Sequence, residues 1–468
     1  YEKKEILYKI KMECPKPHET PETPENKKKI NISILQGSKL FNENTPFIIN
    51  INSPDTMIKK SNVDLICIID ISGSMKAQKL SLVKESLKSL ISLMDSNDRM
   101  ALILFNDKAS RYLGLSYLSK ETKADYKAKI DKIKSRGGTN ILSGLEEAVN
   151  ILKEEKLKEA NKISNEENED NVRVTSLMLL SDGNDNDYND IEIADGLKKL
   201  TKGHNLTFTL HTIGYGEDHD PKIMSRLANL RDGSFYMIEE LDKVQDCFVN
   251  ILGGCMSVMY NEATLKVKAL KDNIKIKKIY GMNKLYKYEL KDNCFETTIL
   301  QFISGKEYTF TIEVELPSII SINDDILEAE FTGETNLADN KQICKYKIVG
   351  GAFSVADEEY LRCKLYDTID RALELKEQKK EEEMKKILNE MKTWIKDNYE
   401  GINKSKYLKK IDETLGLIED NNLFEFKGRS RVTADINENY LKRGGINLNY
   451  SNHYQQMMIN QCKACSQS

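Results

Sequence analysis

A carboxylate and two hydroxyls follow directly after an apolar stretch of this sequence. Asp70, Ser72 and Ser74 stand at alternate positions in the segment DISGS, and residues 63–69 before them are almost entirely apolar. Carboxylate and hydroxyl oxygens suit a hard divalent cation, above all Mg²⁺, which prefers about six oxygens. A tight turn at Gly73 can aim the three side chains at one point. The segment therefore indicates a cation site, with capping of the next helix as the alternative role for these residues.

Two later segments predict oxygen ligands at the same place. Thr139 lies on a Gly-Gly loop directly before an amphipathic helix, and Asp182 follows the apolar stretch 176–181. Buried apolar strands that alternate with helices predict a parallel sheet, whose carboxyl ends meet in one crevice. Because capping one helix needs no matching oxygens on two other loops, these residues favour the cation site.

The segments DISGSM, GGTN and LLSDG, in this order, resemble the von Willebrand factor A domain and its metal-ion-dependent adhesion site. The resemblance implies that Mg²⁺ (or Mn²⁺ or Ca²⁺) is bound by a set of five residues: Asp70, Ser72, Ser74, Thr139 and Asp182. It also implies that an Asp or Glu of a protein partner completes the metal shell. Neutral hydroxyls leave much of the ion's charge uncompensated, which makes an incoming carboxylate attractive.

The hydrophobic periodicity divides the chain into several parts. Residues 62–256 alternate strands and helices, which predicts an α/β, Rossmann-like von Willebrand A domain with a mainly parallel central sheet. Residues 257–350 alternate with period two and predict a β-sandwich, which the strands of residues 1–61 are expected to join. A C-terminal helical region is expected over residues 354–421, and an extended tail over residues 422–468.

Three smaller features have structural interpretations. The charged stretch 374–383 is expected to be a solvated helix face with i,i+4 ion pairs, and the acidic stretch 165–171 a surface loop. His211 lies within a predicted strand, where a buried neutral histidine is expected because no nucleophile with an orienting acid is recognisable around it.

Composition limits the environment and the partners. The chain has 468 residues, a formal net charge of −4 and no apolar stretch long enough to span a bilayer, so neither nucleic acid nor a membrane is indicated as partner. We expect a protein partner within a larger complex. Nine dispersed cysteines favour reduced thiols and a cytoplasmic, intracellular setting. An extracellular setting is the alternative, because the sequence starts at Tyr1 and a signal peptide can precede it.

A closer resemblance involves residues 214–220 (GYGEDHD), 233–236 (GSFY) and 244–248 (VQDCF). These segments resemble intracellular A-domain proteins that include plant RING-type ubiquitin ligases of the WAVY GROWTH group. The RING itself is absent from this sequence, since two zincs need eight paired ligands and Cys462 and Cys465 form the only CxxC. For these cysteines, free thiols are expected, and a zinc site shared between subunits with His453 is the alternative.

The sequence predicts a non-enzymatic interaction or scaffold module that binds a partner's acidic residue through the ion. A substrate-recruiting component of a ubiquitin ligase is one alternative, and a structural component of a stable assembly is another. A metal-dependent phosphatase or nuclease is not supported, because the sequence has no P-loop, no second metal cluster and no evident general base.

Overall fold

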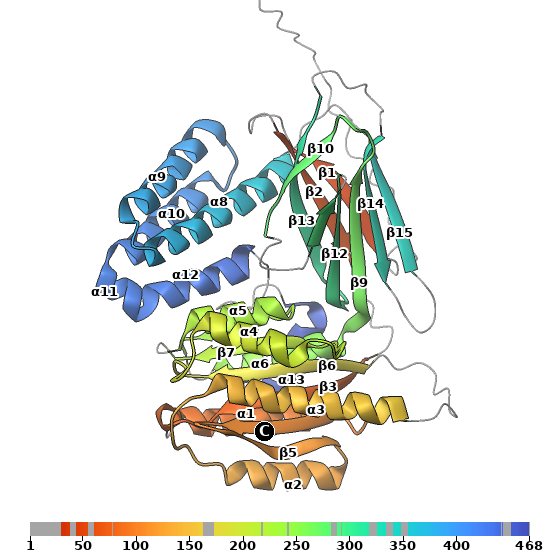
Figure 1. Cartoon of the computed structure of the whole chain (residues 1–468), viewed down its shortest axis with the longest axis vertical. Coiled ribbons are helices and arrows are strands. Elements are labelled where there is room, and N and C mark those ends of the chain that lie inside the picture. Colours follow the sequence, from red (N-terminus) through yellow and green to blue (C-terminus); the bar gives the residue numbers. More distant parts are fainter. Residues whose placement is uncertain are drawn as a thin grey trace, which may run out of the picture.

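The computed structural model of this chain has three parts: an α/β domain, two antiparallel sheets and a group of helices (Figure 1). The structure describes residues 30–37, 44–54, 60–76, 78–161, 173–216, 219–240, 243–281, 288–291, 293–317, 325–333, 340–347, 354–440, 442 and 451–467. The acidic stretch 165–171, expected to be a surface loop, lies outside these residues.

The α/β domain contains a six-stranded sheet in the order β5-β4-β3-β6-β7-β8. Neighbouring strands are parallel except for the edge strand β5, which is antiparallel to β4. The strands are β3 (Asn62–Asp70), β4 (Arg99–Phe105), β5 (Ala109–Tyr117), β6 (Arg173–Ser181), β7 (Thr209–Tyr215) and β8 (Phe235–Ile238). The helices are α1 (Gln78–Leu93), α2 (Lys120–Asp131), α3 (Ile141–Asn161), α4 (Asp190–Thr201), α5 (Pro221–Leu230) and α6 (Val244–Met256). The predicted mainly parallel, Rossmann-like sheet is confirmed.

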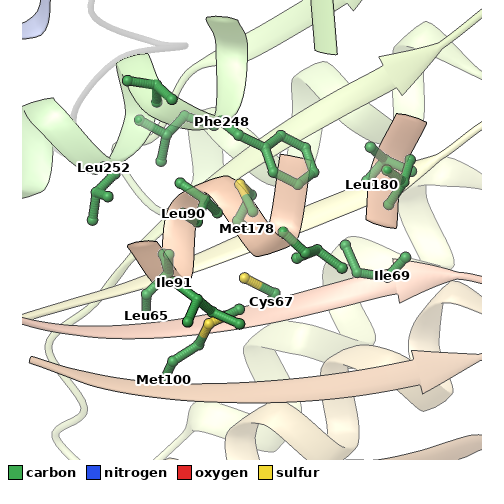
Figure 2. Close-up of a cluster of buried hydrophobic side chains, with 14 of the residues drawn as sticks. Leu65, Cys67, Ile69, Leu90, Ile91, Met100, Met178, Leu180, Phe248 and Leu252 are labelled. Atoms are coloured by element: carbon green, nitrogen blue, oxygen red, sulfur yellow. The ribbon is translucent and has the colours of Figure 1, made fainter. Parts of the chain in front are cut away.

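Helices cover both faces of this sheet, which explains why β3 is apolar throughout. Leu65, Cys67 and Ile69 point into one core, together with side chains of α1 and α6 (Figure 2). Ile66 and Ile68 point the other way, into a core with α3, α4 and α5. This strand, buried on both faces, ends in Asp70, directly before a polar loop. The two cores therefore fix the position of that loop.

The other two sheets pack face to face around a shared apolar core. The strand orders are β1-β2-β13-β10 and β11-β12-β9-β14-β15. Their bounds are β1 (Asn31–Gln36), β2 (Asn44–Asn52), β9 (Val258–Ala269), β10 (Lys275–Ile279), β11 (Tyr288–Lys291), β12 (Cys294–Ile303), β13 (Glu307–Glu315), β14 (Asp325–Gly333) and β15 (Asn340–Lys347). Side chains such as Phe47, Phe295 and Phe302 meet between the sheets. Since β2 pairs with β13, the α/β domain is an insertion between two strands of the sandwich.

The C-terminal region is helical, as predicted. It contains α8 (Ser354–Glu377), α9 (Glu381–Asn398) and α10 (Lys404–Glu419), which share an apolar core. The charged stretch 374–383 is not one continuous helix face, because α8 ends and α9 begins within it. Lys379 between them has a φ of 59°, a left-handed conformation that interrupts helical hydrogen bonding.

The prediction of an extended tail over residues 422–468 is wrong for its described part. Helical turns run through α11 (Asn421–Leu423), a π-helix (Phe424–Gly428), α12 (Arg429–Asp435) and a second π-helix (Ile436–Tyr440), and α13 (His453–Gln467) follows. Val432 and Ile436 complete the core of the C-terminal helices, whereas Met458 and Ile459 pack against the α/β domain. These helices bury their apolar faces on distant parts of the chain, a dependence that local composition does not reveal.

Candidate functional site

Asp70 is the last residue of β3, at the carboxyl end of the strand. The side chain is fully buried. Its Oδ1 accepts the backbone N–H of Ser72 at 2.7 Å, and its Oδ2 accepts the hydroxyl of Ser181 at 2.6 Å. These two bonds fix the carboxylate in the turn between β3 and α1.

The two serines of the turn lead from Asp70 to the neighbouring strand. Ser72 Oγ and Ser74 Oγ are 2.9 Å apart, and the Ser74 hydroxyl donates to Asp182 Oδ1 at 2.7 Å. Asp182 directly follows β6 and is fully buried. Ser72 makes no side-chain capping bond to the short 3₁₀ turn Gly73–Met75. The hydrogen bonds of these hydroxyls therefore link the turn after β3 to Asp182 at the end of β6.

Thr139 reaches the same edge on the loop before α3. The loop is tied to the DISGS turn by a bond from the Gly73 N–H to Gly137 O, 2.9 Å long. A methyl group added at Gly183 would lie 3.8 Å from both Ser74 Oγ and Thr139 Oγ1, so these two hydroxyls flank the same glycine. The structure thus brings all five predicted residues to one edge of the sheet. A chain of hydrogen bonds connects Asp70, Ser72, Ser74 and Asp182, and Thr139 lies close to Ser74.

The charge of Asp70 is incompletely compensated. Burial raises its pKa from the usual 3.8 to about 6, although hydrogen bonds from Ser181 and Ser72 act in the opposite direction. The negative charge of Asp182 raises it further. A cation placed between the two carboxylates would relieve both the burial cost and this repulsion.

The donor set fits a hard cation better than a soft one. It consists of carboxylate and hydroxyl oxygens, and the described residues contain no group of three or more His, Cys, Asp or Glu side chains placed to hold a metal. Oxygen donors with few charges suit Mg²⁺, Mn²⁺ or Ca²⁺, whereas thiolates and imidazoles would favour zinc or copper. The described part of the molecule offers no second metal cluster of the kind that two-metal hydrolases use.

Sequence reasoning missed three residues around this site. Ser181 binds Asp70, Asn186 Oδ1 accepts the N–H of Thr139 at 2.5 Å, and Lys79 Nζ lies 2.5 Å from Asp182 Oδ2. The place of Lys79 in the first turn of the helix after DISGS is a usable sequence signal. The contact between Asn186 and Thr139 depends on the path of the loop after β6. The residues around Asn186 in the sequence do not indicate it.

The tail cysteines are separate from this site. Cys462 lies within α13, buried against α6, and Gln245 Nε2 donates to its sulfur at 2.9 Å. The side chain of Cys465 lies outside the described residues. The contact of Cys462 gives the alternative of a zinc site shared between subunits no support.

Residues 64–249 match the family model of the von Willebrand factor type A domain. This part of the chain is therefore a von Willebrand factor A domain, in agreement with its sheet and helices. No described helix is both long and apolar enough to cross a bilayer.

Two curated relatives are similar to part of the chain. An uncharacterized protein of Synechocystis sp. is 29% identical over 203 residues, which cover 43% of this chain and 44% of that protein. The inter-alpha-trypsin inhibitor heavy chain H2 of Sus scrofa is 28% identical over 194 residues, which cover 41% of this chain and 19% of the heavy chain. The chain thus matches less than half the length of either relative.

Two solved structures share the fold well beyond the A domain. A von Willebrand factor type A protein from Catenulispora acidiphila has a TM-score of 0.62 at 15% identity, covering 89% of this chain and 97% of that one. The ArnB paralog VWA2 from Sulfolobus acidocaldarius has a TM-score of 0.53 at 15% identity, covering 86% and 98%. At such low identity the likeness concerns the fold alone.

Proposed function

We propose that this protein is a non-enzymatic interaction module that binds a divalent cation and, through it, a partner protein. The ion is Mg²⁺, or Mn²⁺ or Ca²⁺, and its proposed ligands are the five residues of a metal-ion-dependent adhesion site: Asp70, Ser72, Ser74, Thr139 and Asp182. An Asp or Glu of the partner completes the shell. The observation that carries the proposal is the convergence of oxygens from three separate loops beside two buried carboxylates.

The chemistry of these ligands explains why a partner is needed. Three of the five are neutral hydroxyls, so the protein compensates a divalent charge only in part. A carboxylate from outside supplies the missing negative charge. The bound ion would supply the attraction, and this chain's residues hold the ion at the open edge of the sheet.

The comparisons support an interaction role at the level of the domain. The name of the inter-alpha-trypsin inhibitor heavy chains states that they are part of an inhibitor. By analogy with such A domains, we propose binding rather than catalysis for this chain. The resemblance to the WAVY GROWTH group and a role beside a ubiquitin ligase stay predictions, as does a purely structural place in a stable assembly.

An intracellular location also stays a prediction, with one supporting observation. Cys67, Cys247, Cys255 and Cys363 are buried free thiols. Burial raises the pKa of Cys247 to about 12 and that of Cys255 to about 11, so these thiols are protonated and unreactive. Free thiols of this kind are typical of a reducing compartment.

Affinity purification with and without a chelator tests the proposal. Wild type is expected to retain a partner in Mn²⁺ or Mg²⁺ and to release it in EDTA, because the ion bridges the two proteins. Thr139→Ala is expected to lose the partner even with metal, whereas Ser135→Ala, a hydroxyl lost from the same loop, should keep it. Partners that resist EDTA and the Thr139 change alike would favour a fixed structural assembly instead.

A further inference from the structure

Lys79 places a positive charge at the proposed cation site. It lies in the first turn of α1, and its Nζ is 2.5 Å from Asp182 Oδ2. Asp182 is fully buried and the Lys79 side chain is only 22% exposed. A methyl group added at Gly216, after β7, would lie 3.3 Å from Nζ, so the ammonium rests against that loop as well. The charge is thus held in a defined place among three elements.

Both carboxylate oxygens of Asp182 have partners within the chain. Ser74 donates its hydroxyl to Oδ1, and Lys79 donates its ammonium to Oδ2. A cation bound by Asp182 would have to share this carboxylate with the ammonium or displace it. Two positive groups close together repel, and the repulsion grows where water is excluded.

We propose that Lys79 competes with the divalent cation for Asp182 and thereby lowers the affinity of the site for the ion. The inference rests on the proposed metal-binding function and concerns how that same site is tuned. The ammonium leaves the two carboxylates with a net charge of about −1 instead of −2, which weakens their attraction for the ion. It also keeps Asp182 paired while no ion is present, so the sheet edge remains stable without metal.

A purely structural role for Lys79 makes a different prediction. If the ammonium only fastens α1 to the end of β6, its loss lowers stability equally with and without metal, and the ion affinity does not change. If it competes with the ion, its loss lowers stability in the metal-free protein, and added metal restores that stability.

Three variants separate these roles. Lys79→Gln removes the charge and retains a hydrogen-bond donor, whereas Lys79→Arg retains the charge. Lys76→Gln is the matched control, because Lys76 is an exposed lysine that precedes α1. Mn²⁺ affinity is measured by isothermal titration calorimetry on the full chain, and melting temperature is measured in EDTA and in Mn²⁺.

The competition predicts that Lys79→Gln binds Mn²⁺ at least about tenfold more tightly than wild type. Lys79→Arg should stay within about threefold of wild type because it retains the positive charge. Lys76→Gln should stay within the same range because an exposed charge is screened. In EDTA, Lys79→Gln should melt below wild type, and Mn²⁺ should close that gap.

Other outcomes distinguish a failure of the proposed competition from a failure of the proposed metal site. Equal Mn²⁺ affinity in wild type and Lys79→Gln would overturn the competition while leaving the metal site intact. Binding by neither protein would overturn the proposed function and the competition together. Binding by Lys79→Gln alone would support the competition and contradict metal binding by the native chain.

Discussion

Two largely buried carboxylates in different parts of the molecule have opposite electrostatic environments. At the end of β3, burial raises the pKa of Asp70 to about 6. On α8, burial acts against the charge of Glu359 too, but hydrogen bonds and charges from Arg362 and Lys442 outweigh it and lower the pKa to about 2. Cationic side chains of the protein neutralise Glu359. The hydrogen-bond partners of Asp70 are hydroxyls and a backbone amide.

The contacts show how this difference arises. Arg362 Nε is 2.8 Å from Glu359 Oε2 and Nη2 is 2.6 Å from Oε1, a bidentate pair to which Lys442 adds a contact of 3.3 Å. No described lysine or arginine lies within ion-pair distance of Asp70. An internal cation makes a carboxylate structural, whereas an uncompensated carboxylate is suited to an external cation.

The largest expected effect is at the uncompensated carboxylate. Asp70→Asn should weaken Mn²⁺ binding at least about a hundredfold, because the amide supplies no charge to the ion. The metal-free stability should not fall, since the buried charge is removed and the isosteric amide retains an acceptor oxygen. Titration calorimetry and urea unfolding in EDTA measure the two quantities.

The control for that change is Asp107→Asn, which removes a charge from a neighbouring exposed loop. Its Oδ1 accepts the N–H of Gly138 at 3.0 Å, and an amide oxygen can keep that bond. Affinity should stay within about threefold of wild type. A hundredfold loss in both variants would mean that general charge, rather than ligation by Asp70, governs binding.

The compensated carboxylate should behave in the opposite way. Glu359→Gln is expected to lower the free energy of unfolding by about 2 kcal/mol, because Arg362 is left largely buried without its counter-charge. Mn²⁺ affinity should not change. Urea unfolding checks the first point and calorimetry the second.

Glu374→Gln on the same helix is the matched control. Glu374 forms an exposed i,i+3 pair with Arg371, so its loss should cost at most about 0.5 kcal/mol. Equal destabilisation by both variants would remove the distinction between a buried, compensated carboxylate and a surface one.

The pH dependence gives a smaller effect with a defined sign. The pKa of Glu359 is lowered from 4.5 to about 2, so its stabilising contribution is complete above pH 4.5 and is lost as the pH falls towards 2. The difference in unfolding free energy between wild type and Glu359→Gln should therefore shrink from pH 5.5 to pH 3.5. Urea unfolding at several pH values measures it, and a difference that grows on acidification would contradict the assigned pairing.

The smallest effect concerns a contact without net charge. A methyl group added at Gly253 on α6 would lie 3.1 Å from Gln455 Cα on α13. Gly253→Ala should therefore cost about 1 kcal/mol through overpacking, without any change in Mn²⁺ affinity. Gly416→Ala on α10 meets nothing within 4 Å and should be neutral or stabilising by up to about 1 kcal/mol. Thermal unfolding of both variants tests whether α13 docks as described.

The sequence was sufficient for the sheet and for the convergence of the five site residues. Apolar strands that end in Asp70 and Asp182 carry a local signal, and parallel topology then brings those ends together. The pairing of Lys79 with Asp182 depends on the three-dimensional position of α1, which spacing alone does not determine. The sequence did not predict the helices α12 and α13, because their apolar residues pack into cores formed by distant segments.

Titration of the metal-free full chain with Mn²⁺ in a calorimeter tests the proposed cation site at the end of β3. We predict saturable binding of about one ion per chain, lost in Asp70→Asn and tightened in Lys79→Gln. Absence of binding heat for wild type, with an equally flat titration for both variants over a range of temperatures, would contradict a cation site at the end of β3.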